Sequence, residues 1–268
     1  MTDLQWTPSH VDSGGESIYY EVTNPDDALA TVVFGHGGAG SHAVWFQQVP
    51  AFAQRFRVVT WDTRGFGGST LRSGALDCDI AAADLGAVLD DIGIDDPVHL
   101  VAQSMGGWWI SCFALCHPER VRSLTYCNTP GGVFTADLEE HFTRFMIDGP
   151  ASSRFLGQHF AIGPSVQASD PTRVFLYQQL NSLSPSPNAA VGTAVAQRFE
   201  PSRLRELAIP TLVVSGSEDP IFPPTLLQGV AEALGARFVS IDNAGHSPYF
   251  ETPEAFNAVL LDFLSQSP

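Results

Sequence analysis

One serine, Ser104, stands between small residues in the segment AQSMGG, directly after the apolar run PVHLV. A sharp turn from a strand into a helix closes only where the flanking residues carry little or no side chain, and Ala102 and Gly106 meet that need. Glycine is the usual residue at the first of these two positions. The turn would lift the hydroxyl above a sheet edge, at a helix N-terminus that favours negative charge. We interpret Ser104 as a nucleophile; an ordinary strand-to-helix connection is the alternative.

A serine attacks efficiently only if a base accepts its proton. His246, in the segment DNAGHSPYF, follows a late apolar run and precedes the last helical pattern of the chain. This placement makes it the candidate base, and a surface histidine at a helix entry is the alternative.

The base in turn needs a carboxylate that fixes its tautomer and stabilises the imidazolium. Asp219, in the segment GSEDP, follows the apolar run PTLVV, and Glu218 is its rival. The following Pro220 and the Gly-x-x-Asp-Pro pattern favour Asp219. An acid could also follow the preceding strand, but Asn128 occupies that position. The order Ser104, Asp219, His246 is the one expected when three loops converge at one sheet edge.

The negative oxygen that forms when a serine attacks a carbonyl needs preorganised N–H donors. We expect one from the backbone of Met105 and one from Gly38, in the loop HGGAG, with Ala39 as the fallback. Glycine-rich loops also bind phosphates. This loop, however, lacks the dinucleotide-binding spacing and has no Lys-Ser or Lys-Thr pair, which disfavours a nucleotide site.

Apolar, β-branched runs alternate with helical patterns along the chain, as in a doubly wound, mostly parallel α/β sheet. We expect strands at residues 30–35, 56–62, 97–103, 121–128, 210–216 and 236–243, with antiparallel edge strands around residues 16–23. We expect helices at residues 79–92, 105–116, 224–234 and 253–264. Residues 131–201 contain helical patterns but no strand pattern. The sequence therefore predicts a core of residues 1–130 and 202–268, with a helical lid inserted as residues 131–201.

Composition excludes several function classes. The formal net charge of −16 argues against nucleic acid, whose binding is driven by Lys and Arg, and against anionic membrane surfaces. No apolar stretch reaches the roughly 18–20 residues that cross a bilayer, and the opening segment MTDLQWTPSHVDSGG lacks the pattern of a signal peptide. We expect a cytoplasmic protein that uses no metal and no cofactor, with its four cysteines reduced. Asp62 and Arg64, in WDTRGFGGST, are expected to form an ion pair below the glycine loop.

Five motifs in this order, HGGAG, DTRGFGGS, AQSMGG, GSEDPIFP and AGHSPYFETPEAF, resemble those of the α/β-hydrolase superfamily, in its lid-bearing subgroup of esterases, lactonases and carbon–carbon bond hydrolases. The resemblance covers about residues 16–264. It implies an eight-stranded sheet with the lid after the sixth strand, Ser104, Asp219 and His246 as the catalytic triad, and Gly38 and Met105 as donors to the oxyanion. Haloalkane dehalogenases and epoxide hydrolases of the superfamily carry Asp in place of the serine, so Ser104 speaks against both.

The resemblance implies hydrolysis of a small to medium carboxylic ester or lactone through an acyl-enzyme. We expect an apolar or aromatic substrate, and we assign Trp45, Trp108 and Phe134 to its pocket. Cleavage of a carbon–carbon bond in a β-diketone-like substrate is one alternative, although Gln103 stands where those relatives often carry Asn. A ligand-binding receptor with vestigial activity is another. The sequence leaves the substrate and the oligomeric state open.

Overall fold

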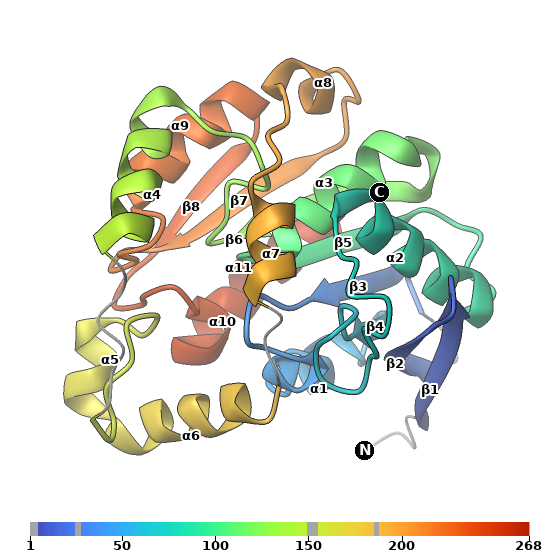
Figure 1. Ribbon diagram of the computed structural model, residues 1–268, viewed down its shortest axis with the longest axis horizontal. Coiled ribbons are helices and arrows are strands. Elements are labelled where there is room, and N and C mark those ends of the chain that lie inside the picture. The colour runs from blue at the N-terminus through green and yellow to red at the C-terminus, as the bar shows by residue number, and fades with distance from the viewer. Residues whose placement is uncertain (1–4, 25–27, 149–154, 185–187, 268) are drawn as a thin grey trace.

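A single sheet of eight strands forms the centre of the computed structural model, which describes residues 5–24, 28–148, 155–184 and 188–267 (Figure 1). The strand order is β1-β2-β4-β3-β5-β6-β7-β8. β2 pairs antiparallel with β1 and with β4, and all other neighbouring strands are parallel. The strands span Gln5–Ser13, Glu16–Asn24, Thr31–Gly35, Arg57–Trp61, Val98–Gln103, Val121–Cys127, Thr211–Gly216 and Arg237–Ile241. This arrangement confirms the predicted α/β fold.

The burial pattern of the strands explains why the sequence predicts the positions of the central strands. Every residue of β3 and of β5 is buried, as expected for parallel strands that helices cover on both faces. The edge strand β1 behaves differently: its residues are exposed or half-buried, and it contains Pro8. Proline is tolerated at an edge because no further strand needs its missing N–H.

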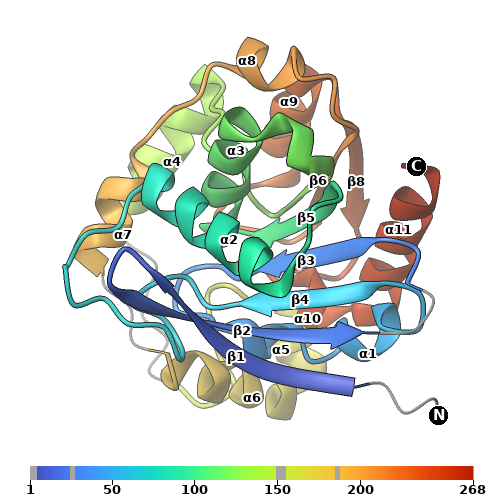
Figure 2. The ribbon, with the colours of Figure 1, turned by 90° about the vertical axis from the view of Figure 1, so that its right-hand side faces the viewer.

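Helices cover both faces of this sheet (Figure 2). α2 (Cys78–Ile92), α3 (Gly106–Cys116) and α9 (Pro224–Leu234) lie on one face, and α1 (Val49–Phe52) and α11 (Pro253–Gln266) lie on the other. The shorter elements η1, η2 and α10 span His42–Trp45, Pro118–Arg120 and Pro248–Glu251. Local signals set the helix ends. The Asp77 side chain caps the start of α2, and the left-handed Gly93 ends it.

The described residues between β6 and β7 form five helices: α4 (Ala136–Asp148), α5 (Pro164–Ser169), α6 (Pro171–Ser182), α7 (Asn188–Val195) and α8 (Pro201–Arg205). α8 packs on the core helices α3 and α9. We call residues 131–200 the helical insertion; residues 149–154 and 185–187 of the predicted lid lie outside the described residues.

The helical insertion contacts loops at the carboxyl edge of the sheet. Gly67 N, after β4, donates to Ser184 Oγ, and Trp108 Nε1, after β5, donates to Gln197 O. His246 N, after β8, donates to Ala161 O. The insertion therefore covers the edge where the candidate site residues lie.

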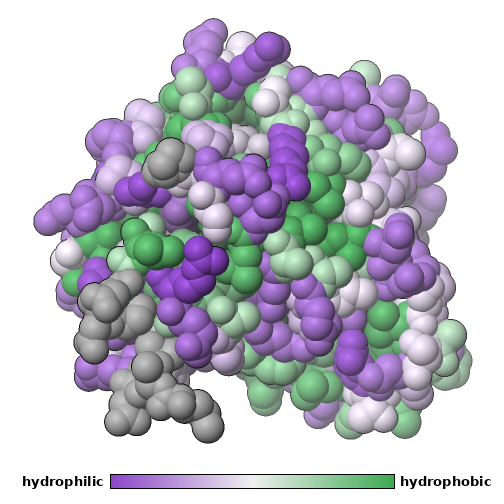
Figure 3. All heavy atoms as spheres, turned by 180° about the vertical axis from the view of Figure 1, so that it is seen from behind, coloured by the Kyte–Doolittle hydropathy of each residue, from purple (hydrophilic) through white to green (hydrophobic). Residues whose placement is uncertain are grey.

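The outer surface mixes polar and apolar side chains, as the face opposite to that of Figure 1 illustrates (Figure 3). Among the described residues, no helix has the length and apolar character needed to cross a membrane.

The expected ion pair between Asp62 and Arg64 is wrong, because the two side chains reach different partners. Arg64 extends to α2, where its guanidinium donates two hydrogen bonds, of 2.5 and 2.7 Å, to the buried Asp84 carboxylate. Asp62 instead accepts hydrogen bonds from the backbone N–H and the ring Nδ1 of His42 and from the backbone of Gly68.

The buried Arg64–Asp84 pair yields a stability prediction. Asp84→Asn removes the charge that compensates Arg64, so we expect it to lower the free energy of unfolding by about 3 kcal/mol in urea denaturation. Asp90→Asn is the matched control, since Asp90 lies on the same helix and pairs with Arg120 at an exposed position. Equal losses in the two variants would contradict the prediction.

Candidate active site

The turn at Ser104 joins β5 to α3. Ser104 has a φ of +49°, in the left-handed region that side chains rarely adopt. Two backbone hydrogen bonds hold it there: Ser104 N donates to Cys127 O at 3.0 Å, and Gly107 N donates to Ser104 O at 2.9 Å. The hydroxyl is half-buried and makes no hydrogen bond within the described residues.

Three glycines allow neighbouring segments to approach this turn. A Cβ at Gly106 would lie 2.7 Å from His36 O, and one at Gly107 would lie 2.5 Å from Thr129 Cγ2. A Cβ at Gly37 would lie 1.9 Å from the Gln103 amide oxygen. Side chains at these positions would force the loops apart, so the glycine pattern seen in the sequence has a packing cause.

His246 and Asp219 are brought together by the loops after β8 and β7. His246 Nδ1 lies 2.9 Å from Asp219 Oδ2, and both side chains are buried. Since a carboxylate only accepts, Nδ1 carries a proton, and in the neutral imidazole Nε2 is then the nitrogen with the lone pair. Gln103, which precedes Ser104, donates its amide to His246 O at 3.0 Å and so ties the histidine loop to the serine turn.

Glu218, the rival acid, faces away from His246. Its carboxylate accepts hydrogen bonds from the backbone and the hydroxyl of Ser165 in α5. Of the two neighbouring acids, Asp219 is the one that contacts the candidate base.

Asn128 is a residue whose part in the site the sequence did not reveal. Its φ is +50°, and its amide donates to Asp219 Oδ2 at 2.7 Å and to Gly245 O at 3.1 Å. The other oxygen of the Asp219 carboxylate, Oδ1, accepts hydrogen bonds from the backbone N–H groups of Ile221 and Phe222. Four donors, counting His246, thus hold one carboxylate. A polar residue at the carboxyl end of the apolar strand β6 was the available signal.

The glycine loop after β3 is fixed by His36. Nδ1 of this buried histidine donates to Gly37 O at 2.7 Å, and its Nε2 accepts the N–H of Thr63 at 3.0 Å. Burial lowers the pKa of His36 and keeps it neutral, as this pattern requires. The N–H groups of Gly38 and Met105 have no acceptor within the described residues. Both predicted oxyanion donors are therefore available to a ligand.

A row of aromatic rings runs from His246 to the helical insertion. Neighbouring ring centroids in the row lie between 5.4 and 6.0 Å apart. In order, the row contains His246, Phe222, Phe142, Phe134 and Trp108. Two of the three residues assigned to the substrate pocket, Trp108 and Phe134, belong to it.

Trp45, the third residue assigned to the pocket, is fully buried and lies elsewhere. Its ring packs on Phe34 and Tyr249, with centroids 4.8 and 4.6 Å away. These are the contacts of a core residue. Trp108 and Trp109 are also fully buried, but Trp108 Nε1 donates to Gln197 O of the insertion, whereas Trp109 Nε1 has no hydrogen-bond partner within the described residues.

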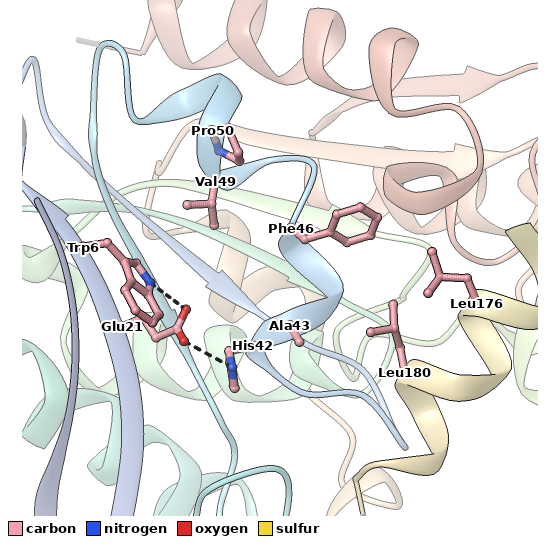
Figure 4. Close-up of a pocket in the computed structure, with 9 residues that line it drawn as sticks. All are labelled: Trp6, Glu21, His42, Ala43, Phe46, Val49, Pro50, Leu176 and Leu180. Atoms are coloured by element: carbon pink, nitrogen blue, oxygen red, sulfur yellow. Dashed lines mark hydrogen bonds and ion pairs between the residues drawn. The ribbon is translucent and has the colours of Figure 1, made fainter. Parts of the chain in front are cut away.

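A separate pocket of about 420 Å³ lies between β1, β2, η1, α1 and α6 (Figure 4). In it, Glu21 joins Trp6 and His42 by a hydrogen bond and an ion pair. Burial alone would lower the pKa of His42, but the carboxylates of Asp62 and Glu21 outweigh it and raise that pKa. Its lining residues are Trp6, Glu21, His42, Ala43, Phe46, Val49, Pro50, Leu176 and Leu180, which include no candidate site residue.

One group of metal-binding residue types occurs in the described part of the chain. Potential ligand atoms of Asp79, Cys112 and Cys116 lie within 4.8 Å of one another, towards the C-terminal end of α3. The Cys112 thiol donates to Asp79 at 3.1 Å, and burial together with that hydrogen bond raises the pKa of Cys112. Metal ligation requires the thiolate, which these surroundings disfavour.

The chain belongs to the alpha/beta hydrolase family, whose model matches residues 32–259. It is 27% identical to the putative carbamate hydrolase RutD of Azorhizobium caulinodans, over 94% of this chain and 97% of that protein.

Solved structures give the same picture. A thermophilic esterase from Thermogutta terrifontis superposes with a TM-score of 0.81 at 25% identity, covering 97% of this chain and 99% of the esterase. Est816, described as an N-acyl homoserine lactone degrading enzyme, superposes with a TM-score of 0.77 at 26% identity, covering 95% and 100% of the two chains. Fold and relatives identify the chain as a hydrolase of the alpha/beta family.

The amide of Asn128 provides a test of the site geometry. Asn128→Gly keeps the left-handed backbone accessible and removes one donor to the Asp219 carboxylate, so we expect kcat to fall roughly tenfold with KM little changed. Asn243→Gly is the control, because Asn243 is exposed and also has a positive φ, of +57°. A loss of equal size in both variants would assign the effect to the backbone and not to the amide.

Proposed function

We propose that this chain is a serine hydrolase that cleaves small to medium carboxylic esters or lactones through an acyl-enzyme on Ser104. The observation that carries the proposal is the 2.9 Å hydrogen bond between His246 Nδ1 and Asp219, on a loop that Gln103 ties to the left-handed turn at Ser104. The esterase and the lactone-degrading enzyme among the similar structures support this bond type.

In the first step, the Ser104 hydroxyl oxygen attacks the carbonyl carbon while His246 Nε2 accepts its proton. Asp219 stabilises the imidazolium that results. The developing oxyanion accepts the free N–H groups of Gly38 and Met105. When the intermediate collapses, His246 returns the proton to the leaving alcohol, and the acyl group stays on Ser104.

In the second step, a water molecule gives a proton to His246 as its oxygen attacks the acyl carbon. When this second intermediate collapses, the bond from the acyl carbon to Ser104 Oγ breaks and His246 returns the proton to Oγ, which releases the carboxylic acid and restores the free serine. Every transfer is a proton transfer or an acyl transfer within these residues, so the proposed reaction uses no metal and no cofactor.

The substrate side of the proposal rests on the aromatic row. Phe142 and Phe134 of the insertion and Trp108 of α3 continue the row of rings that starts at His246 and Phe222, which favours an apolar or aromatic acyl group. The insertion, in the position of the predicted lid, would exclude water from this group. Trp45 has core contacts, and we leave it out of the proposed pocket.

A hydrolysis panel tests the reaction class. Esters of graded acyl length, lactones and β-diketone-like compounds are assayed with the wild type and with Ser104→Ala. We expect ester or lactone turnover that falls by at least about a thousandfold in the variant, and labelling of the wild type by a serine-directed phosphonate. Preferential turnover of the diketones would favour a carbon–carbon bond hydrolase, and binding without turnover would favour a ligand-binding receptor. Full activity of Ser104→Ala would contradict the acyl-enzyme mechanism.

The identity of the acid is tested separately. Asp219→Asn leaves Nδ1 of His246 without its carboxylate partner, so we expect kcat to fall by a factor on the order of a thousand or more. Glu218→Gln is the matched control, because it makes the same change of charge at the adjacent residue and does not touch His246. The reverse ranking of the two variants would reassign the acid.

A further inference from the structure

Glu251, the last residue of α10, is a buried carboxylate that the proposed reaction does not use. Only 1% of it is exposed, yet no cation neutralises it within the described residues. Three backbone N–H groups bind it instead. Gly163 and Gly245 donate to Oε2 at 2.7 and 2.9 Å, and Ser247 donates to Oε1 at 3.0 Å.

These three donors come from two separate segments. Gly245 and Ser247 are the immediate neighbours of His246, whereas Gly163 belongs to the helical insertion. His246 itself donates its backbone N–H to Ala161 O of the insertion at 3.0 Å. All three consecutive N–H groups around the candidate base are therefore held either by Glu251 or by the insertion.

The two segments meet backbone to backbone. A Cβ at Gly163 would lie 2.8 Å from Gly245 N, and a Cβ at Gly245 would lie 2.4 Å from Gly163 N. A side chain at either position would push the insertion off the histidine loop. The Glu251 carboxylate can bridge Gly163 and Gly245 only because both are glycines.

Further hydrogen bonds join α6 of the insertion to the same loop. The hydroxyls of Tyr177 and Ser247 lie 2.9 Å apart, and the Arg173 guanidinium donates to the backbone oxygen of Glu251 at 2.7 Å. Movement of the insertion away from the core would break these contacts together with those of Ala161 and Gly163.

Protonation decides whether Glu251 can accept all three N–H groups. Burial raises its pKa to about 7, against the opposing effect of its three backbone hydrogen bonds, and the nearby Asp219 charge adds to the rise. At pH 8 the carboxylate is mainly ionised, and both oxygens act as acceptors. Measurements on this residue are therefore best made at pH 8.

We propose that Glu251 is a positioning residue that couples docking of the helical insertion to the orientation of His246. The base is fully aligned only when Gly163 and Ala161 of the insertion are seated, so proton transfer is confined to the covered site. This inference rests on the proposed role of His246 as the base, and it assigns Glu251 no contact with the substrate.

Glu251→Gln tests the coupling at pH 8. A glutamine offers one acceptor oxygen and an NH₂ group, which would face at least one backbone N–H, so at least one of the three hydrogen bonds is lost. We expect kcat to fall roughly tenfold to hundredfold, with KM changed by a smaller factor. Hydrogen–deuterium exchange should speed up at Gly163, Gly245 and Ser247, while the central strands β5 and β6 keep their protection.

Glu254→Gln is the matched control, since Glu254 lies three residues further on, is exposed and starts α11. It should keep wild-type kcat and exchange. Gly163→Ala disturbs the same contact from the insertion side, and it replaces Glu251→Gln as the test if Glu251→Gln does not fold. It should lower kcat in the same way. If both variants fold, the Gly163→Ala, Glu251→Gln double variant should lose no more kcat than the more impaired single variant.

Three results would overturn the coupling. They are a Glu251→Gln enzyme with wild-type kcat, one whose kcat falls while exchange at Gly163 stays unchanged, and additive losses in the double variant. Failure of the proposed function is distinguishable, because it appears as retained turnover in Ser104→Ala, whereas the exchange measurement needs no turnover.

Discussion

The left-handed turn at Ser104 is the constraint around which the active-site edge is arranged. Such a backbone costs on the order of 1–3 kcal/mol and persists only where its surroundings hold it in place. Here Cys127 O binds its N–H, and Gly37 and Gly106 let the glycine loop and the start of α3 close on it. The same close approach leaves the N–H groups of Met105 and Gly38 without acceptors in the part of the chain that the structure describes. Strain at one residue and free donors beside it are thus two results of one packing arrangement.

Much of the fold was predictable because parallel strands covered on both faces leave continuous apolar runs. The six parallel strands fall within the predicted ranges, and α9 has the predicted bounds, since Pro224 begins it and Gly235 ends it. The sequence also singled out Ser104, Asp219 and His246 by their positions after strands. The structure joins the last two by a hydrogen bond, and Gln103, the residue before Ser104, donates its amide to His246 O.

What the sequence could not supply were contacts between distant segments. Trp45 lies close to the glycine loop along the chain, but η1 turns its ring into the core. Arg64 lies two residues from Asp62, yet its partner is Asp84 on α2. Asn128 reaches Asp219, 91 residues further on, and Glu251 reaches Gly163, 88 residues back, and residue type alone does not say which carboxylate or N–H each will contact. The strand β1 was missed at its position because an exposed edge strand leaves only a weak apolar pattern.

The backbone contact between Gly163 and Gly245 has a consequence for exchanging parts between related enzymes. The short segment from Ala161 to Gly163 supplies a carbonyl oxygen to the backbone N–H of His246, the proposed base, and an N–H to the Glu251 carboxylate. Arg173 and Tyr177 of α6 add hydrogen bonds to Glu251 and Ser247. A chimaera that replaces the rest of the insertion but keeps these two residues and residues 161–163 would preserve the hydrogen bonds to the histidine loop.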